Sequence, residues 1–239
     1  RYSYGQCFTE AEGGYNAIQH TRNDVIRGTT SQPRTVDECE HKLYRTVMGT
    51  LLYVSLCTRP DISYAVSLLC RHMHNPQEAD IQAMKHLLKY VKGTQNYRLL
   101  LGCQDTEVIG YSDSSYADCV NTRRSTAGYL FTYKGGPISW KSSLQRTVCL
   151  STAEAEYLAL AAAAQEAVYQ QQLISELQLN AIDKNQVVQL YTDNQAAKAI
   201  AENNQGGQRA KHIEVRYHFL RQLIREKRIQ VNYVKANMQ

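Results

Sequence analysis

The chain has 239 residues, of which 43% are hydrophobic and 21% are charged, and its formal net charge at pH 7 is +5. This length permits one large domain or two small ones, and no stretch approaches the roughly 20 apolar residues needed to cross a bilayer. The seven cysteines are scattered without a C-x-x-C pair, which argues against a disulfide framework and a structural zinc site and favours an intracellular compartment.

The beginning of the chain carries neither a signal-peptide pattern nor an initiator methionine. We therefore expect a chain that was cut from something longer. Residues 1–36 show weak periodicity and several turn formers, and we predict an irregular segment there.

Three helices are predicted in residues 37–96, which we interpret as a small all-helical unit. Asp37 fits the N-cap position of the first helix, and Asp61 fits the cap of the second. A third helix is predicted over about 77–91. Helical spacing predicts the following buried face for the first helix: Leu43, Val47, Leu51 and Val54.

From residue 97 onward the pattern changes to short runs of β formers, followed by an alternation of helices and strands. This order predicts an α/β fold, in which helices flank a mixed sheet over residues 97–239. Strands are predicted at 98–101, 108–113, 127–133, 138–144, 187–192 and 229–234, with a turn at 135–137. Helices are predicted at 151–177, 194–202 and 212–227.

Three acidic residues lie where carboxylates can converge. Asp113 and Asp193 each end a predicted hydrophobic strand, and Glu156 lies in the first turns of the long helix. Together they could form a cluster of hard oxygen ligands suited to Mg²⁺. Each one alone has a second interpretation, since an aspartate after a strand often caps a turn and a glutamate near a helix start is favoured by the helix dipole.

The C-terminal part of the chain is basic. From Gln205 onward eight basic residues face only two acidic ones, Glu214 and Glu226. Such a stretch suits a phosphate backbone, although a solvated helix face explains the charge equally well. We expect Leu220 and Ile224 to point inward from the last helix. Its polar side chains are expected on the other faces: Arg216, His218, Arg221 and Arg225.

Six motifs, in this order, resemble the ribonuclease H domain of copia-type retrotransposon Pol polyproteins. They occupy residues 111–118, 123–129, 138–142, 150–157, 191–197 and 211–219. Upstream, residues 44–53, 58–63 and 88–94 resemble the family's connection segment between its reverse transcriptase polymerase and ribonuclease H. The resemblance implies an irregular segment at 1–36, a helical connection segment at 37–96 and a ribonuclease H-like domain at 97–239.

The resemblance implies an endonuclease that hydrolyses the RNA strand of RNA–DNA hybrids during reverse transcription, by a two-metal-ion mechanism using Mg²⁺ or Mn²⁺. Its catalytic and metal-binding carboxylates fall on Asp113, Glu156 and Asp193. Glu154 is a rival for the helix position, but residues two apart differ by about 200° around a helix, so only one can face the ions. The implied partners are the hybrid and the polymerase part of the same polyprotein. Expected substrate contacts are Ser114, Asn194, His212 and Arg216.

One departure from the family concerns its fourth carboxylate, which lies in an Ala-Asp pair after the last strand. The chain ends before this pair, and we expect a truncated domain with a weakened metal site. Glu214 stands where the family often has Asp, either as a substitute ligand or as a solvated helix residue. The alternative function is therefore an impaired or co-opted Pol fragment that binds nucleic acid without cutting it.

Overall fold

The computed structural model describes residues 35–102, 107–177, 187–202 and 211–235, with the side chains of 211–217 left undescribed. The predicted segment 1–36 therefore lies almost wholly outside the described residues. The chain divides into two compact units, Arg1–Leu99 and Leu100–Gln239. Among the described helices, none combines the length and the apolar character that a membrane span requires.

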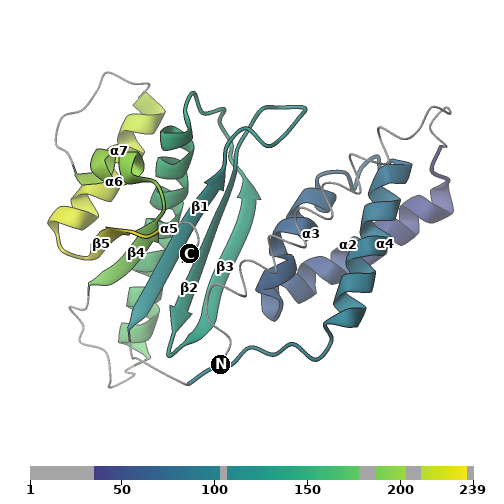
Figure 1. Ribbon diagram of the computed structural model, residues 1–239, viewed down its shortest axis with the longest axis horizontal. Coiled ribbons are helices and arrows are strands. Elements are labelled where there is room, and N and C mark those ends of the chain that lie inside the picture. Colours follow the sequence, from purple (N-terminus) through teal and green to yellow (C-terminus); the bar gives the residue numbers. More distant parts are fainter. Residues whose placement is uncertain (1–34, 103–106, 178–186, 203–210, 236–239) are drawn as a thin grey trace. The chain divides into compact units, whose positions relative to one another are not determined.

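The first unit is helical, as predicted. It contains α2 (Glu38–Cys57), the short 3₁₀ helix η1 (Pro60–Ile62), α3 (Ser63–Cys70) and α4 (Glu78–Gly93) (Figure 1). Asp37 caps α2 in a reciprocal capping box, because its carboxylate accepts from the Glu40 amide and Glu40 accepts from the Asp37 amide. At the start of α4 the Asp80 carboxylate likewise accepts from the Gln77 amide at 2.9 Å, while the Asp80 amide donates to the Gln77 backbone carbonyl.

The buried face of α2 differs from the predicted one. Tyr44, Met48 and Leu51 are buried, whereas Leu43 is 56% exposed. The hydroxyl of Tyr44 donates to the carbonyl of Leu69 on α3, which satisfies its polar atom inside the core. The predicted face is confirmed at Leu51 and wrong at Leu43, while Val47 and Val54 pack partly buried against the same core. The face is turned toward Tyr44 and Met48, which the prediction did not include.

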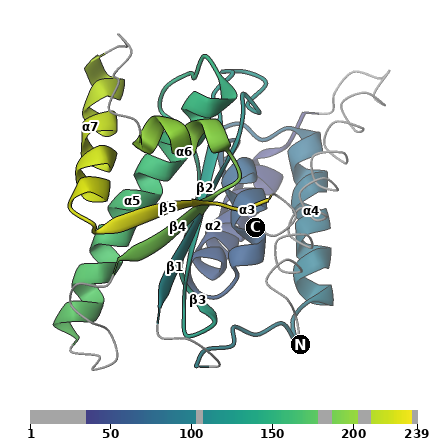
Figure 2. The same cartoon turned by 60° about the vertical axis from the view of Figure 1, so that its left-hand side comes forward.

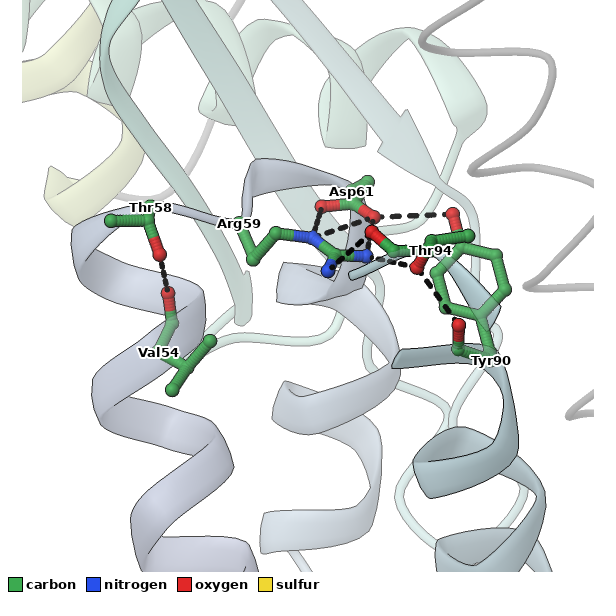
Figure 3. A network of polar contacts seen from close by, with 6 residues as sticks. All are labelled: Val54, Thr58, Arg59, Asp61, Tyr90 and Thr94. Atoms are coloured by element: carbon green, nitrogen blue, oxygen red, sulfur yellow. Dashed lines mark hydrogen bonds and ion pairs between the residues drawn. The ribbon is translucent and has the colours of Figure 1, made fainter. Parts of the chain in front are cut away.

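Asp61 does not cap α3, contrary to the prediction. Its carboxylate accepts from Nε of Arg59 at 2.8 Å and from Nη2 of Arg59 at 2.6 Å. The hydroxyl of Tyr90 donates to the same carboxylate at 3.1 Å (Figure 3). Because two donor groups occupy this side chain, it serves as the counter-charge of a buried arginine and leaves the start of α3 without a side-chain cap.

The guanidinium of Arg59 also binds the end of α4. Its Nη2 donates to the Thr94 hydroxyl at 2.6 Å, and its Nη1 donates to the Thr94 carbonyl at 3.3 Å (Figure 3). The rings of Tyr90 and Tyr97 lie 5.8 and 5.9 Å from the guanidinium carbon, within cation–π range. We call Arg59, Asp61, Tyr90 and Thr94 the arginine network; it ties the segment after α2 to the last turn of α4.

The second unit is built on a five-stranded sheet of order β3-β2-β1-β4-β5 (Figure 1). Strands β1 (Val108–Ser115), β2 (Thr126–Tyr133) and β3 (Gly136–Leu144) are antiparallel neighbours. Strands β4 (Val188–Thr192) and β5 (Ile229–Tyr233) continue the sheet in parallel with β1. This mixed sheet with flanking helices confirms the predicted α/β fold class.

Helices α5 (Thr152–Glu176), α6 (Gln195–Glu202) and α7 (Lys211–Arg225) flank this sheet (Figure 2). Small alanine side chains of α5 allow close packing on the strands, and Ala163, Ala164 and Ala167 are fully buried. The core that they share with the sheet includes Phe131 of β2 and Leu190 of β4. Helix α5 is thereby held against the central strand β1 and its two neighbours, β2 and β4.

The predicted strand at 98–101 does not form. The amide of Gly102 instead donates to the carbonyl of Lys134, in the turn between β2 and β3. This turn also lies one residue earlier than predicted, since Lys134 and Gly135 both adopt positive φ and β3 begins at Gly136. Positive φ at both central residues matches the twist of the paired strands.

Candidate metal centre

Three carboxylates from three elements meet at one edge of the sheet. Asp113 lies near the end of β1, Asp193 directly follows β4, and Glu156 lies near the start of α5. Because β1 and β4 are parallel neighbours, paired at Tyr111 and Tyr191, their carboxyl ends reach the same edge. One ligand oxygen from each carboxylate lies within 4.8 Å of the others. We call these three residues the acidic cluster.

The amide of Ser114 joins two members of the acidic cluster. It donates to Oδ1 of Asp113 at 2.7 Å and to Oε1 of Glu156 at 3.2 Å. One N–H group shared between two carboxylates satisfies neither completely. The other oxygen of Glu156, Oε2, is buried and has no hydrogen-bond partner within the described part of the chain. Such an orphaned buried oxygen in a native fold calls for a missing partner.

The electrostatics of the acidic cluster are unfavourable in the chain alone. The side chain of Glu156 is only 6% exposed, and burial raises its pKa, with further contributions from the negative charges of Asp113 and Asp193, to about 9. A cation among the three side chains would offset both causes. The donor set consists of hard carboxylate oxygens, which fit Mg²⁺ or Mn²⁺. The acidic cluster can therefore hold a divalent metal ion.

Glu154, the rival for the helix position, has another partner. Its Oε2 accepts from the amide of Leu150 at 2.8 Å, just before the Ser151 cap of α5. It is buried there, and it is not part of the acidic cluster. The geometry thus brings Glu156, and not Glu154, to the two aspartates.

The predicted substrate residues have different surroundings. Ser114 contacts the acidic cluster, because its amide donates to the carboxylate of Asp113. The side chain of Asn194 instead accepts from the Ala197 amide at 2.9 Å and caps α6. The side chains of His212 and Arg216, like that of Glu214, lie outside the described residues.

The position of Arg221 differs from the one predicted for the basic residues of the last helix. We expected it on a solvated face of α7, but its side chain is 8% exposed and its Nη2 donates to the carbonyl of Ile200 at 3.2 Å. The long side chain therefore joins α7 to α6 instead of facing solvent. His218 and Arg225 are exposed, as expected.

Sequence reasoning missed Gln145, which is buried directly after β3 and donates to both Ser114 and Ala155. No sequence pattern marks it, because a glutamine next to Arg146 and Thr147 is typical of an exposed loop.

A hollow of about 220 Å³ lies beside the acidic cluster and not at it. Its lining includes Gly128, Tyr129 and Lys141 from the strands and Glu166 from α5, and none of the three carboxylates. Asp113 is itself exposed. The acidic cluster therefore meets the surface at Asp113, with Glu156 buried beneath it, and such an arrangement suits a long polymer better than an enclosed small molecule.

Comparisons with known proteins give a consistent picture, although no protein-family model matches the chain. The Pol polyprotein of transposon TNT 1-94 from Nicotiana tabacum is 38% identical over 208 residues, covering 86% of this chain and 15% of that protein. The Pol polyprotein of transposon RE1 from Arabidopsis thaliana is 36% identical over 197 residues, covering 82% of this chain and 13% of that protein. The chain thus spans a small part of these polyproteins.

A shorter relative is secreted RxLR effector protein 161 of Plasmopara viticola, 44% identical over 127 residues, covering 53% of this chain and 89% of that protein. Among solved structures, the ribonuclease H1 called LC11, isolated from compost, aligns with a TM-score of 0.41 and 15% identity, covering 55% of this chain and 86% of that one. At this TM-score the likeness carries no weight for function; the strand order and the three helices define the fold.

Proposed function

Because this chain belongs to the copia-type retrotransposon Pol polyproteins and carries their ribonuclease H-like domain, we propose that it is an endonuclease that hydrolyses the RNA strand of RNA–DNA hybrids during reverse transcription. The observation that carries the proposal is the convergence of Asp113, Glu156 and Asp193 within 4.8 Å at an open edge of the sheet. The proposed domains are a helical connection segment at 37–96 and a ribonuclease H-like domain at 97–239, close to the structural division at Leu99.

In this proposal the three carboxylates hold Mg²⁺ or Mn²⁺ and act as the catalytic residues. Once bound, a pair of ions supplies Lewis acidity that activates a water and stabilises the departing oxygen. The water oxygen becomes bonded to phosphorus while the bond from phosphorus to the 3′ oxygen breaks, which leaves a 3′-hydroxyl and a 5′-phosphate. The chain's own part is to keep Glu156 against the Ser114 amide, so that its charge remains beside the two aspartates.

Recognition of the hybrid is proposed for residues around the acidic cluster. Ser114 and Asn194 are adjacent in sequence to Asp113 and Asp193, and polar groups there can reach the 2′-hydroxyls that distinguish RNA from DNA. His212 and Arg216 remain proposed phosphate contacts, which would position the backbone without reading the bases. The polymerase part of the polyprotein is the proposed partner that delivers the hybrid.

The test is cleavage of an end-labelled RNA–DNA hybrid by this chain in Mg²⁺ and in Mn²⁺. We expect cuts in the RNA strand only, no cuts in a DNA duplex, and no activity in excess chelator. The variant Asp113→Asn should lose at least about 100-fold in rate, since a metal ligand is replaced by a neutral one. The exposed residue Glu107, which directly precedes β1, provides the control: Glu107→Gln should cut at the wild-type rate.

Cleavage by Asp113→Asn at the wild-type rate would exclude the proposed active site. If the wild-type protein binds the hybrid but leaves it uncut in both metals, the endonuclease proposal is wrong. The alternative function, a Pol fragment that binds nucleic acid without cutting it, would then take its place.

A further inference from the structure

The side chain of Gln145 touches the neighbours of two members of the acidic cluster. Its Nε2 donates to Oγ of Ser114 at 3.4 Å and to the carbonyl of Ala155 at 2.9 Å. Ser114 follows Asp113 on β1, and Ala155 precedes Glu156 on α5. A single amide group therefore connects the end of β1 to the first turns of α5.

Gln145 is itself held firmly. Its Oε1 accepts from the thiol of Cys149 at 3.0 Å, and its backbone amide donates to the carbonyl of Ser125 at 2.8 Å. The side chain is 8% exposed. Both hydrogens of its primary amide and its carbonyl oxygen are thus engaged, which fixes the direction in which the side chain points.

The acidic cluster needs such a connection because its members repel one another. Asp113 and Glu156 come from different elements, and their shared contact is the amide of Ser114. If α5 began slightly further from β1, Glu156 would lose that amide and move away from the aspartates. The hydrogen bond from Gln145 to Ala155 opposes this movement at the residue next to Glu156.

We propose that Gln145 is a positioning residue, which holds the start of α5 against the end of β1 so that Glu156 and Asp113 keep the spacing required to bind a divalent cation. It does not touch the substrate or the ion. Neighbouring hydrogen bonds of this kind commonly change metal affinity by about 10- to 100-fold when they are removed. Only the use of the ion for hydrolysis rests on the proposed function.

The first measurement is amide hydrogen exchange in the metal-free protein, comparing Ser114 with Leu190, a fully buried residue of β4. In Gln145→Leu we expect the Ser114 amide to exchange at least about tenfold faster relative to Leu190. The matched control is Gln170→Leu, which removes another buried glutamine, far along α5, whose Nε2 donates to Glu166. That variant should leave the ratio within about twofold of the wild type.

The second measurement is Mn²⁺ binding by calorimetry, far below the unfolding temperature of each variant. The dissociation constant should rise about tenfold in Gln145→Leu and stay within about twofold in Gln170→Leu. Equal acceleration of both amides, or equal Mn²⁺ affinity in the two leucine variants, would show that Gln145 only supports the fold.

Should Gln145→Leu fail to fold, Cys149→Ala takes its place. It frees only the carbonyl end of Gln145, and the Ser114 amide should still accelerate about fivefold relative to Leu190, beyond the twofold range of the control; a ratio within that range would overturn the proposal. Because the exchange experiment uses neither metal nor nucleic acid, it decides the role of Gln145 even if the wild-type chain cuts no hybrid.

Discussion

In the helical unit Arg59 and Asp61 are buried as opposite charges, whereas in the sheet unit Asp113, Glu156 and Asp193 bring like charges together. The arginine network is complete, since the Asp61 carboxylate receives hydrogen bonds from Arg59 and Tyr90 (Figure 3). The hydrogen bond with Asp61 raises the pKa of Arg59 further above its ordinary value. In the acidic cluster the carboxylate of Glu156 accepts from one N–H group, which it shares with Asp113, and its other oxygen has no hydrogen-bond partner among the described residues.

This difference separates a carboxylate that the chain neutralises itself from one that it leaves without a counter-charge. Asp61 and Glu156 both lie in the interior or at its edge. Where the chain supplies the counter-charge, as Arg59 does for Asp61, the group stabilises the fold. Where the chain supplies none, as around Glu156, the fold gives up stability and presents carboxylates that can hold a cation.

Breaking the arginine network should have the largest effect on stability. In Arg59→Met the charge of Asp61 stays buried without its partner, and we expect the helical unit to lose about 3–5 kcal/mol of unfolding free energy. Trp140 is the only tryptophan and lies in β3, so its fluorescence follows the sheet unit alone, while far-UV circular dichroism follows both units. In urea, the dichroism transition of the helical unit should move and the fluorescence transition should stay.

The control for this prediction is the double variant Arg59→Met, Asp61→Asn. It removes both charges and should recover at least half of the lost stability, because no uncompensated charge remains. A single variant within about 1 kcal/mol of the wild type would contradict the view that the pair is buried and complete.

The corresponding change in the acidic cluster should have the opposite sign. In metal-free protein at pH 8, Glu156→Gln removes a buried carboxyl group that has to take up a proton on folding. We expect the sheet unit to gain about 1–2 kcal/mol of unfolding free energy, followed by Trp140 fluorescence. The same variant should lose the stabilisation that Mg²⁺ gives the wild type. Destabilisation without metal would show that Glu156 has a counter-charge after all.

The pH dependence sharpens the same contrast. The pKa of Glu156 is about 9 in the fold against an ordinary value of 4.5. The unfolded chain therefore releases this proton at lower pH, and metal-free stability should fall as the pH rises from about 4.5 to about 9. The difference between wild type and Glu156→Gln isolates this group. In saturating Mg²⁺ the fall should largely disappear; an identical pH profile for both proteins would contradict the prediction.

The smallest expected effect concerns one hydroxyl of the arginine network. Tyr90→Phe removes the hydrogen bond to Asp61 but keeps the three hydrogen bonds from Arg59, so the helical unit should lose about 1 kcal/mol. Tyr53, which is 70% exposed on α2, provides the control, and Tyr53→Phe should leave the dichroism transition unchanged. A loss as large as that of Arg59→Met would mean that the hydroxyl, and not the ion pair, holds the network together.

Most elements could be predicted because their periodicity is set locally. The N-cap predicted at Asp37 is confirmed, and the long helix predicted from residue 151 begins at Thr152 with Ser151 as its cap. The strand expected at 98–101 did not form, because β formers make a strand only when a partner strand is available. The role of Asp61 was missed for a similar reason, since its partner Tyr90 lies 29 residues away.

The acidic cluster was predicted from motif order, since three carboxylates at two strand ends and one helix start form a recognisable set. Its supporting residues were not. Gln145 and Arg221 are polar residues whose burial depends on partners from other elements, and a single sequence carries no sign of that burial. A polar residue next to a predicted cluster can therefore be buried even when its sequence context indicates an exposed loop.

The strand order has a consequence for the time at which the acidic cluster can assemble. The hydroxyl of Ser112 on β1 lies 3.5 Å from the carbonyl of Tyr191 on β4, which is 79 positions further along the chain. A growing chain exposes β1, β2 and β3 first, and their antiparallel pairing closes only short loops. Asp113 can therefore come close to Glu156 and Asp193 only after α5 and β4 have packed against β1. We expect the acidic cluster to form late in folding. A divalent cation would then bind the folded domain more tightly than its partly folded intermediates.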